Sequence, residues 1–191
     1  NVYMTAYGYR ATTPPKHHRV DYNTPVIRHF VMDFDCQDFK KRNKVDFSFV
    51  QSQVVRLHKH LLLNNWKHFI WFSGGGYHIY IPIETVKGES FLPSSGLDVS
   101  RIKQAGKELL LRWHKELDLP SSDPTVAFDT AGMIRIPNSY NMKRGCWSIP
   151  LEHEEILEIS DINDMIELAQ EPRTGYISHG DKTIQLELKE K

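Results

Sequence analysis

The sequence predicts a protein of the α+β class, and three observations predict it. Residues 2–10 alternate apolar with small or polar side chains and residues 26–35 form an apolar run, which is typical of β-strands. In residues 46–64 and 98–117, apolar positions recur with the spacing of a helix that covers a sheet. Two further strand-like runs meet at the glycines of residues 74–76, where we expect a hairpin.

The composition of the chain is that of a globular protein without a membrane-spanning segment. The chain has 191 residues, 40% of them hydrophobic, so a single domain over residues 1–191 can bury a sizeable core. No apolar run approaches the roughly 20 residues that span a bilayer, and the N-terminus lacks a signal-peptide pattern. We therefore expect no membrane contact and a cytoplasmic or nucleoid-associated location, or a nuclear one in a eukaryote. Cys36 and Cys146 have no CxxC spacing, so no structural zinc is expected.

Charge is unevenly distributed along a chain that is neutral as a whole. Residues 1–70 carry 11 Lys and Arg against 5 Asp and Glu, a net charge of +6. The acidic C-terminal segment, residues 151–191, carries 4 against 11, a net charge of −7. The basic part suits a polyanionic partner. The acidic segment is interpreted as a solvated face, with docking of a partner protein as the alternative.

The first strand leads into a basic loop and then into a strand that ends in two carboxylates. The prolines and the basic stretch of residues 11–25 predict an exposed loop, which is either solvated or clamps phosphate. Asp33 and Asp35 follow at the end of the next strand. Strand side chains alternate between faces, so both carboxylates point one way and Phe34 points the other. Such a pair is either two solvated acids or a site for a divalent cation such as Mg²⁺.

A basic turn at residues 40–44 precedes the first helix, which is predicted to cover the sheet. Its apolar face consists of Val50, Val54, Leu57 and Leu61. His58 and His60 are two positions apart and fall on different helix faces, so we expect them to be solvated rather than to share a metal.

The glycines of residues 74–76 exceed what a hairpin turn needs. Glycine is favoured where backbone approaches a ligand closely, and exposed amides can cradle phosphate oxygens. Ser73 adds a hydroxyl at the loop and His78 adds an imidazole on the strand that leaves it. The sequence therefore favours a nucleotide phosphate site, and the alternative is a tight hairpin with an incidental histidine.

The second half of the chain adds a third carboxylate and a cationic segment. Asp98 is expected to cap the second helix, and residues 126–129 read as a short strand that ends in Asp129. Residues 134–145 follow a turn at Gly132 and concentrate cationic and hydrogen-bonding groups. Residues 152–170 are predicted to be partly helical and residues 183–188 to form a late strand. The expected buried face of the helical part is Ile162, Met165, Ile166 and Ala169.

Three elements together resemble the motifs of the archaeo-eukaryotic primase superfamily. They are the Asp-x-Asp strand, the Ser-Gly-Gly-Gly-Tyr-His turn, and an Asp followed by Arg-x-Pro-x-Ser with a downstream Lys-x-Gly, within residues 26–145. The resemblance implies an RRM-like catalytic sheet packed with an N-terminal αβ unit. It also implies DNA-templated nucleotidyl transfer from nucleoside triphosphates with Mg²⁺ or Mn²⁺ on a single-stranded DNA template. A helicase or a primase large subunit would be the protein partner.

The resemblance also implies roles for individual residues. Asp33, Asp35 and Asp129 look like the catalytic, metal-binding carboxylates. The nucleotide-binding set looks like Ser73, Gly74, Gly75, Gly76, His78, Arg135, Asn141 and Lys143. Cellular small subunits usually have a histidine at the position of Asn141, basic residues where Gly75 and Gly76 stand, and a zinc knuckle that this chain lacks. These departures point toward compact primase-polymerases of mobile elements or toward end-joining repair polymerases.

Two other functional classes remain open at this point. A metal-dependent nuclease also uses three carboxylates, but it does not need an extended phosphate-binding set after the third one. A non-catalytic nucleic-acid-binding module of the same fold usually loses carboxylates, and all three matching positions here are acidic. The sequence therefore favours catalysis.

Overall fold

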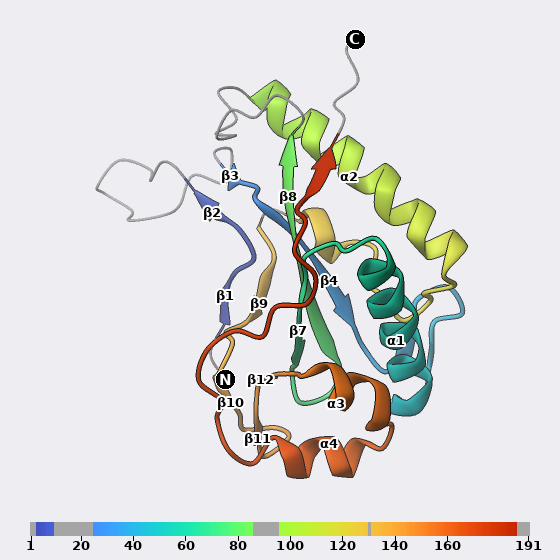
Figure 1. Ribbon diagram of the computed structural model, residues 1–191, viewed down its shortest axis with the longest axis vertical. Coiled ribbons are helices and arrows are strands. Elements are labelled where there is room, and N and C mark those ends of the chain that lie inside the picture. Colours follow the sequence, from blue (N-terminus) through green and yellow to red (C-terminus); the bar gives the residue numbers. More distant parts are fainter. Residues whose placement is uncertain (1–2, 10–24, 86–95, 130, 187–191) are drawn as a thin grey trace.

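The predicted mixed α+β class is confirmed. The computed structural model describes residues 3–9, 25–85, 96–129 and 131–186, and Figure 1 shows a central sheet with helices on one side and at one end. Most of the basic loop expected at residues 11–25, the connection at residues 86–95 and the last residues of the chain lie outside these ranges. Within them, no helix combines the length and apolar character needed to cross a membrane.

The central sheet is organised around its longest strand, β8 (Tyr77–Thr85). It pairs antiparallel with β4 (His29–Phe34) and with β7 (Phe69–Phe72), and β7 and β8 form the expected hairpin. Two short strands from the end of the chain complete the sheet. β12 (Ile149–Pro150) pairs antiparallel with β7, and β13 (Ile184–Leu186) lies parallel to the end of β8.

Four antiparallel strand pairs surround this sheet. They are β1 (Tyr3–Thr5) with β9 (Met133–Arg135), β2 (Gly8–Tyr9) with β3 (Pro25–Val26), β5 (Gln37–Asp38) with β6 (Asn43–Lys44), and β10 (Tyr140–Asn141) with β11 (Cys146–Trp147). The single strand expected over residues 2–10 is therefore two strands. Ala6 and Tyr7 interrupt it because both bend into the core, where they are buried.

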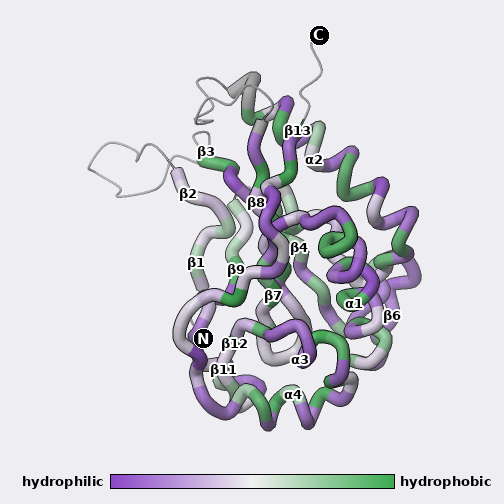
Figure 2. Tube along the Cα trace, in the orientation of Figure 1, coloured by the Kyte–Doolittle hydropathy of each residue, from purple (hydrophilic) through white to green (hydrophobic). Residues whose placement is uncertain are grey.

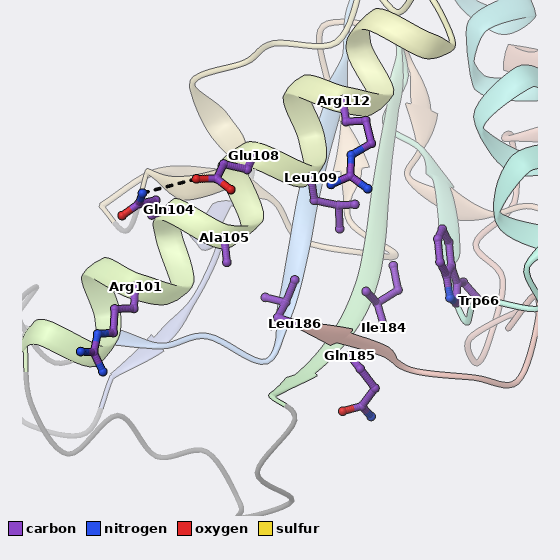
Figure 3. Close-up of a pocket in the computed structure, with 10 residues that line it drawn as sticks. All are labelled: Trp66, Arg101, Gln104, Ala105, Glu108, Leu109, Arg112, Ile184, Gln185 and Leu186. Carbon is purple, nitrogen blue, oxygen red and sulfur yellow. Dashed lines mark hydrogen bonds between the residues drawn. The ribbon is translucent and has the colours of Figure 1, made fainter. Parts of the chain in front are cut away.

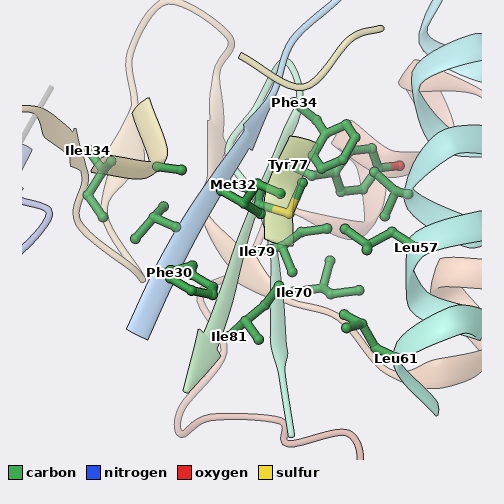
Figure 4. Close-up of a cluster of buried hydrophobic side chains, with 14 of the residues drawn as sticks. Phe30, Met32, Phe34, Leu57, Leu61, Ile70, Tyr77, Ile79, Ile81 and Ile134 are labelled. Atoms are coloured by element: carbon green, nitrogen blue, oxygen red, sulfur yellow. The ribbon is translucent and has the colours of Figure 1, made fainter. Parts of the chain in front are cut away.

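Helix α1 (Phe47–Leu63) covers one face of the central sheet, as expected. Its predicted apolar positions are all fully buried. Figure 4 shows Leu57 and Leu61 facing Ile70, Tyr77 and Ile79 of the sheet. Each aliphatic side chain removed from water in this way stabilises the fold by about 1.5–3 kcal/mol. This face of the sheet is therefore fully used for packing, and a site must lie on the other face.

The remaining helices differ in detail from the expected ones. Helix α2 (Gly96–Glu116) begins two residues before Asp98 and alternates hydrophobic with hydrophilic positions along its length (Figure 2). The acidic segment forms two short helices, α3 (His153–Glu158) and α4 (Ile162–Leu168). Met165 and Ala169 are buried and Ile162 and Ile166 are partly buried, so the predicted face is confirmed.

The prediction of a strand at residues 126–129 is wrong. Residues Val126–Phe128 form a 3₁₀ helix, η1, because the Asp129 amide bonds back to the Val126 carbonyl, 3.3 Å away, instead of joining a ladder. The Asp123 carboxylate fixes the turn before it by accepting hydrogen bonds from the Thr125 amide and hydroxyl. Tyr7 donates its hydroxyl to the Ala127 carbonyl, which uses the backbone of η1 in a tertiary contact.

Two of the three consecutive glycines have a structural reason. Gly74 has a φ of +99°, and a Cβ there would overlap the Asn141 side chain. A Cβ on Gly76 would overlap the Phe34 carbonyl oxygen at the end of β4. Gly75 has room for a side chain, since the Arg144 guanidinium would lie 3.4 Å from a Cβ at this position. Gly74 and Gly76 therefore permit close approaches within the protein itself, to the Asn141 side chain and to the Phe34 backbone.

We expect Gly76→Ala to destabilise the protein by roughly 2–4 kcal/mol, because a backbone carbonyl cannot move away from the added methyl group without breaking the end of β4. Gly8→Ala is the matched control, since a Cβ at Gly8 meets nothing within 4 Å. Urea unfolding monitored by circular dichroism measures both. Equal stability of the two variants would contradict the close approach.

Candidate active site

A cleft of about 640 Å³ lies on the sheet face opposite α1. It collects residues from β4, the β7–β8 loop, β8, β9 and the segment around β10. Its lining consists of Tyr3, Asp33, Asp35, Cys36, Gln37, Lys44, Ser73, Gly75, His78, Met133, Ile134, Arg135, Asn141, Lys143 and Arg144. Eight of the residues that the sequence singled out thus line one cavity, although they span residues 33–143 of the chain.

Asp33 and His78 form the floor of this cleft. They are directly opposite each other on β4 and β8, so their side chains share a face of the sheet. The His78 Nε2 lies 3.5 Å from the Asp33 Oδ1. Burial, together with the charges of Asp35 and Asp123, raises the pKa of Asp33 to about 7. Burial and the charge of Arg135 lower the pKa of His78 to about 4, so this histidine is neutral at physiological pH.

Asp35 follows β4 at the mouth of the cleft and is exposed. Partial desolvation of the carboxyl by the surrounding cleft and the nearby charge of Asp123 raise the pKa of Asp35, whereas the charge of Arg144 lowers it. The predicted same-face arrangement is confirmed, because both carboxylates line the cleft while Phe34 between them is buried toward α1. The two acids repel each other, which favours a proton or a cation between them.

Asp123 is an acidic neighbour that sequence reasoning missed. Its backbone amide donates to the Asp33 carbonyl at 2.8 Å, and its charge raises the pKa of both Asp33 and Asp35. An isolated bridge between Phe34 and Ser122 places this loop beside the end of β4. Nothing in the sequence around residue 123 marks it, since an Asp-Pro pair in a loop is a common turn signal.

Asp129, the third carboxylate implied by the resemblance, does not line the cleft. It follows η1, is exposed, and accepts a hydrogen bond from the Ala131 amide. Gly74 and Gly76 also support the cleft from behind rather than lining it. The structure thus brings together Asp33 and Asp35 with Asp123, and leaves Asp129 at the start of the turn that leads into β9.

Four cationic side chains also line the cleft, Lys44, Arg135, Lys143 and Arg144, and we call them its cationic wall. Arg135 is buried and donates to the Tyr3 hydroxyl at 3.2 Å, with its guanidinium 5.1 Å from the Tyr3 ring centroid. Lys143, Arg144 and Lys44 are more exposed, and the last two were not singled out from the sequence. A buried, stacked guanidinium is held in one orientation, which suits recognition of a phosphate oxygen.

Asn141 connects the two loops that frame the cleft. Its side-chain amide donates to the Ser73 carbonyl at 2.9 Å, and its side-chain oxygen accepts from the Lys143 amide at 3.2 Å. The glycine loop and the basic segment are therefore held at a fixed distance from each other. Asn141 acts here as a positioning residue.

The carboxylates alone do not form a complete metal-binding group. Across the described ranges, no set of three or more histidine, cysteine or acidic side chains is arranged to hold a metal ion as it stands. The raised pKa of Asp33 nevertheless fits a divalent cation, because a bound cation favours the ionised form that burial and two acidic neighbours oppose. Mg²⁺ is commonly held by one or two carboxylates together with substrate phosphates.

A second cavity, of about 420 Å³, lies between α2 and β13 (Figure 3). Leu109, Ile184 and Leu186 point into it, with Arg101 and Arg112 at its ends. None of the predicted site residues lines it. The acidic pair and the cationic wall make the first cleft the candidate active site.

Comparison of the chain with models of known protein families and with curated proteins finds no match in either case. The chemistry of the cleft is therefore argued from its own residues.

We expect Asp33→Asn to stabilise the metal-free protein above neutral pH. Because the folded-state pKa of Asp33 is raised from 3.8 to about 7, stability from its protonation is full below pH 3.8 and is lost as the pH rises through 7. The amide removes this loss, so the gain in unfolding free energy should be on the order of 2 kcal/mol at pH 8 and vanish near pH 4.

Thermal unfolding across this pH range measures the effect, and Asp181→Asn, at an exposed aspartate outside the cleft, is the control. A pH-independent difference between Asp33→Asn and the wild type would contradict the raised pKa.

Proposed function

We propose that this chain is a DNA-templated nucleotidyltransferase of the primase or primase-polymerase type. The observation that carries the proposal is the convergence of Asp33, Asp35 and His78 with a cationic wall in one cleft. A nuclease site would need the carboxylates but not four basic side chains in the same cleft. The order of the three sequence motifs supports the same class.

The division of labour within the cleft follows from its charges. Asp33 and Asp35 would hold Mg²⁺ or Mn²⁺, with Asp123 as the acidic neighbour that keeps the local potential negative. The bound ion would supply Lewis-acid activation of the primer 3′-hydroxyl and charge neutralisation at the triphosphate. Arg135, Lys143 and Arg144 of the cationic wall would bind the triphosphate oxygens.

The reaction joins the primer 3′-oxygen to the α-phosphorus of the nucleotide while the bond to pyrophosphate breaks. Negative charge grows on the leaving pyrophosphate, and the buried Arg135 stabilises it without reorganising, because Tyr3 already fixes its orientation. Neutral His78 donates a ring N–H to a phosphate oxygen without adding charge near Asp33. Ser73 and the Gly75 backbone frame the same end of the cleft.

The partners proposed for this activity are single-stranded DNA, nucleoside triphosphates, and a helicase or a primase large subunit. The proposed location is the cytoplasm or the nucleoid, or the nucleus of a eukaryotic cell. An end-joining repair polymerase has the same chemistry and differs in its DNA substrate, which the cleft does not distinguish.

The first expected outcome is that the chain incorporates labelled nucleotides on a single-stranded template with Mg²⁺ or Mn²⁺, and that Asp33→Ala/Asp35→Ala lowers the rate by roughly 1000-fold or more. Reactions with and without a primer separate strand initiation from extension. Asp181→Ala is the matched control. Metal-dependent degradation of the template without incorporation would favour a nuclease, and neither reaction would favour a non-catalytic binding module.

The same assay distinguishes the two candidates for the third carboxylate. Asp123→Asn should reduce incorporation by roughly 10- to 100-fold, because the charge of Asp123 acts on both Asp33 and Asp35. A larger loss in Asp129→Asn than in Asp123→Asn would show that Asp129 moves into the cleft with substrate.

His78→Ala should raise the nucleotide KM by about 10-fold or more with little change in the Mg²⁺ requirement, since its ring faces the phosphate end of the cleft. Steady-state incorporation at varied nucleotide and metal concentrations measures both. An unchanged nucleotide KM would make this histidine a structural partner of Asp33 only.

A further inference from the structure

Four histidines from distant parts of the chain meet beside α1, away from the cleft. They are His58 in the middle of α1, His68 just before β7, His153 at the start of α3 and His179 before β13. His58 and His68 are fully buried and His179 is 8% exposed. The expectation that His58 is solvated is therefore wrong. Its neighbours in space are three other imidazoles, which no spacing in the sequence indicates.

Backbone carbonyls fix which ring nitrogens carry protons in two of these histidines. The His68 Nδ1 lies 2.8 Å from the Trp66 carbonyl oxygen, and the His179 Nε2 lies 3.0 Å from the Leu151 carbonyl oxygen. A carbonyl oxygen only accepts, so each of these nitrogens donates. In the neutral ring, the other nitrogen is then unprotonated: Nε2 of His68 and Nδ1 of His179. Burial lowers the pKa of His58 to about 3 and that of His68 to about 4, so neutral rings are favoured.

His58 lies between the other rings. Its Nδ1 is 2.7 Å from the His68 Nε2, and its Nε2 is 2.8 Å from the His153 Nδ1. The ring centroids of His58, His68 and His179 are mutually 5.0, 4.9 and 5.3 Å apart. Three imidazoles on one tetrahedral zinc ion, with Zn–N near 2.0–2.1 Å, have centroids roughly 5 Å apart. The three rings therefore have the mutual spacing of a metal-bound trio.

We propose that His58, His68 and His179 form a binding site for one divalent transition-metal ion of the kind that prefers imidazole, such as Zn²⁺. The ligand atoms are the His58 Nδ1, the His68 Nε2 and the His179 Nδ1, and a water molecule takes the fourth position. This site is separate from the carboxylate cleft and does not depend on the proposed nucleotidyl transfer.

Each proposed ligand already has a partner for its other nitrogen. Metal-bound histidines typically donate that N–H to a carbonyl, a carboxylate or another acceptor, which fixes the tautomer. Trp66 and Leu151 provide carbonyls for His68 and His179. The His153 Nδ1 lies 2.8 Å from the His58 Nε2 and donates to it in the metal-free protein; when a metal takes the His58 Nδ1, both rings change tautomer and the His153 Nδ1 accepts instead. The backbones of His68 and His179 also bond to each other in both directions, at 2.8 and 2.9 Å, which holds two of the ligands in register.

Binding of a metal ion requires the rings of His58 and His68 to move slightly apart. Two nitrogens on one tetrahedral zinc ion are about 3.3 Å apart, whereas the His58 Nδ1 and His68 Nε2 share a proton at 2.7 Å. This contraction agrees with the finding that the described side chains form no metal-holding group as they stand. Separating the two rings by about half an ångström leaves a metal-sized gap, and the metal displaces the proton from the His58 Nδ1. His58 then carries its proton on Nε2, and His153 carries its own on Nε2 instead of Nδ1, so that one proton is released to solvent from the His58 Nδ1 and one is taken up at the His153 Nε2.

The site can be tested in the full chain carrying Asp33→Ala/Asp35→Ala, so that the cleft carboxylates do not bind the probe. Metal-free protein is titrated with Co²⁺ and, separately, with Zn²⁺. We expect one equivalent to bind, to raise the midpoint of thermal unfolding, and to give a visible Co²⁺ spectrum without the near-ultraviolet band of thiolate ligation. That absence excludes Cys36 and Cys146 as ligands.

In the same background, His68→Asn and His179→Asn should each weaken binding by about 100-fold or more, and His153→Asn by about 10- to 100-fold. His114→Asn on α2, outside the cluster, should bind normally, and circular dichroism of each metal-free variant verifies folding. Folded parent protein that takes up no equivalent of either ion overturns the proposal, as does binding that survives His68→Asn and His179→Asn. Nucleotide incorporation by the wild type is a separate result, and its failure leaves this site standing.

Discussion

The contact between Gly76 and the carbonyl end of β4 is the constraint on which the candidate site depends. It lets the loop of the β7–β8 hairpin lie against the backbone of Phe34, with no side chain between them. The ladder register then follows, and Asp33 stands opposite His78. A single backbone approach therefore determines which acid faces which imidazole, while the other face of the same strands is used for packing against α1 (Figure 4).

The electrostatics of the cleft follow from that geometry. Folding brings three carboxylates near the end of β4, and burial raises the pKa of two of them, Asp33 and Asp35. In the same cleft, Arg135 is oriented by Tyr3, and Asn141 holds the basic segment against the glycine loop. The fold thus gathers carboxylates and cationic side chains around one space, which a polyanionic substrate and a cation together would neutralise.

Much of this arrangement could be predicted from residue patterns, and some of it could not. The Asp-x-Asp pair and the helix α1 follow from local periodicity, because side-chain direction in a strand or helix is fixed by position. Arg144 and Lys44 line the cleft, and Asp123 lies near its carboxylates, through packing of segments distant in sequence, which leaves no periodic signal. Three apolar residues before Asp129 suit a strand, whereas the turn hydrogen bonds of Asp123 and the Asp129 amide favour a 3₁₀ helix. The neighbours of His58 could not be predicted either, since they lie 10 to 121 residues away along the sequence.

The parallel pairing of β13 with β8 has a consequence for how the chain folds. Ile184 lies opposite Ile83, so the two strands are joined across about a hundred residues of intervening chain. Closing so long a loop costs entropy before any contact rewards it, and such pairings form late and slowly. During synthesis, the end of β8 must wait with an open hydrogen-bonding edge until residues 184–186 have left the ribosome. A chain stalled or shortened before residues 184–186 would present that edge to other molecules, so quality control of this protein is expected to act on chains in which β13 has not yet paired.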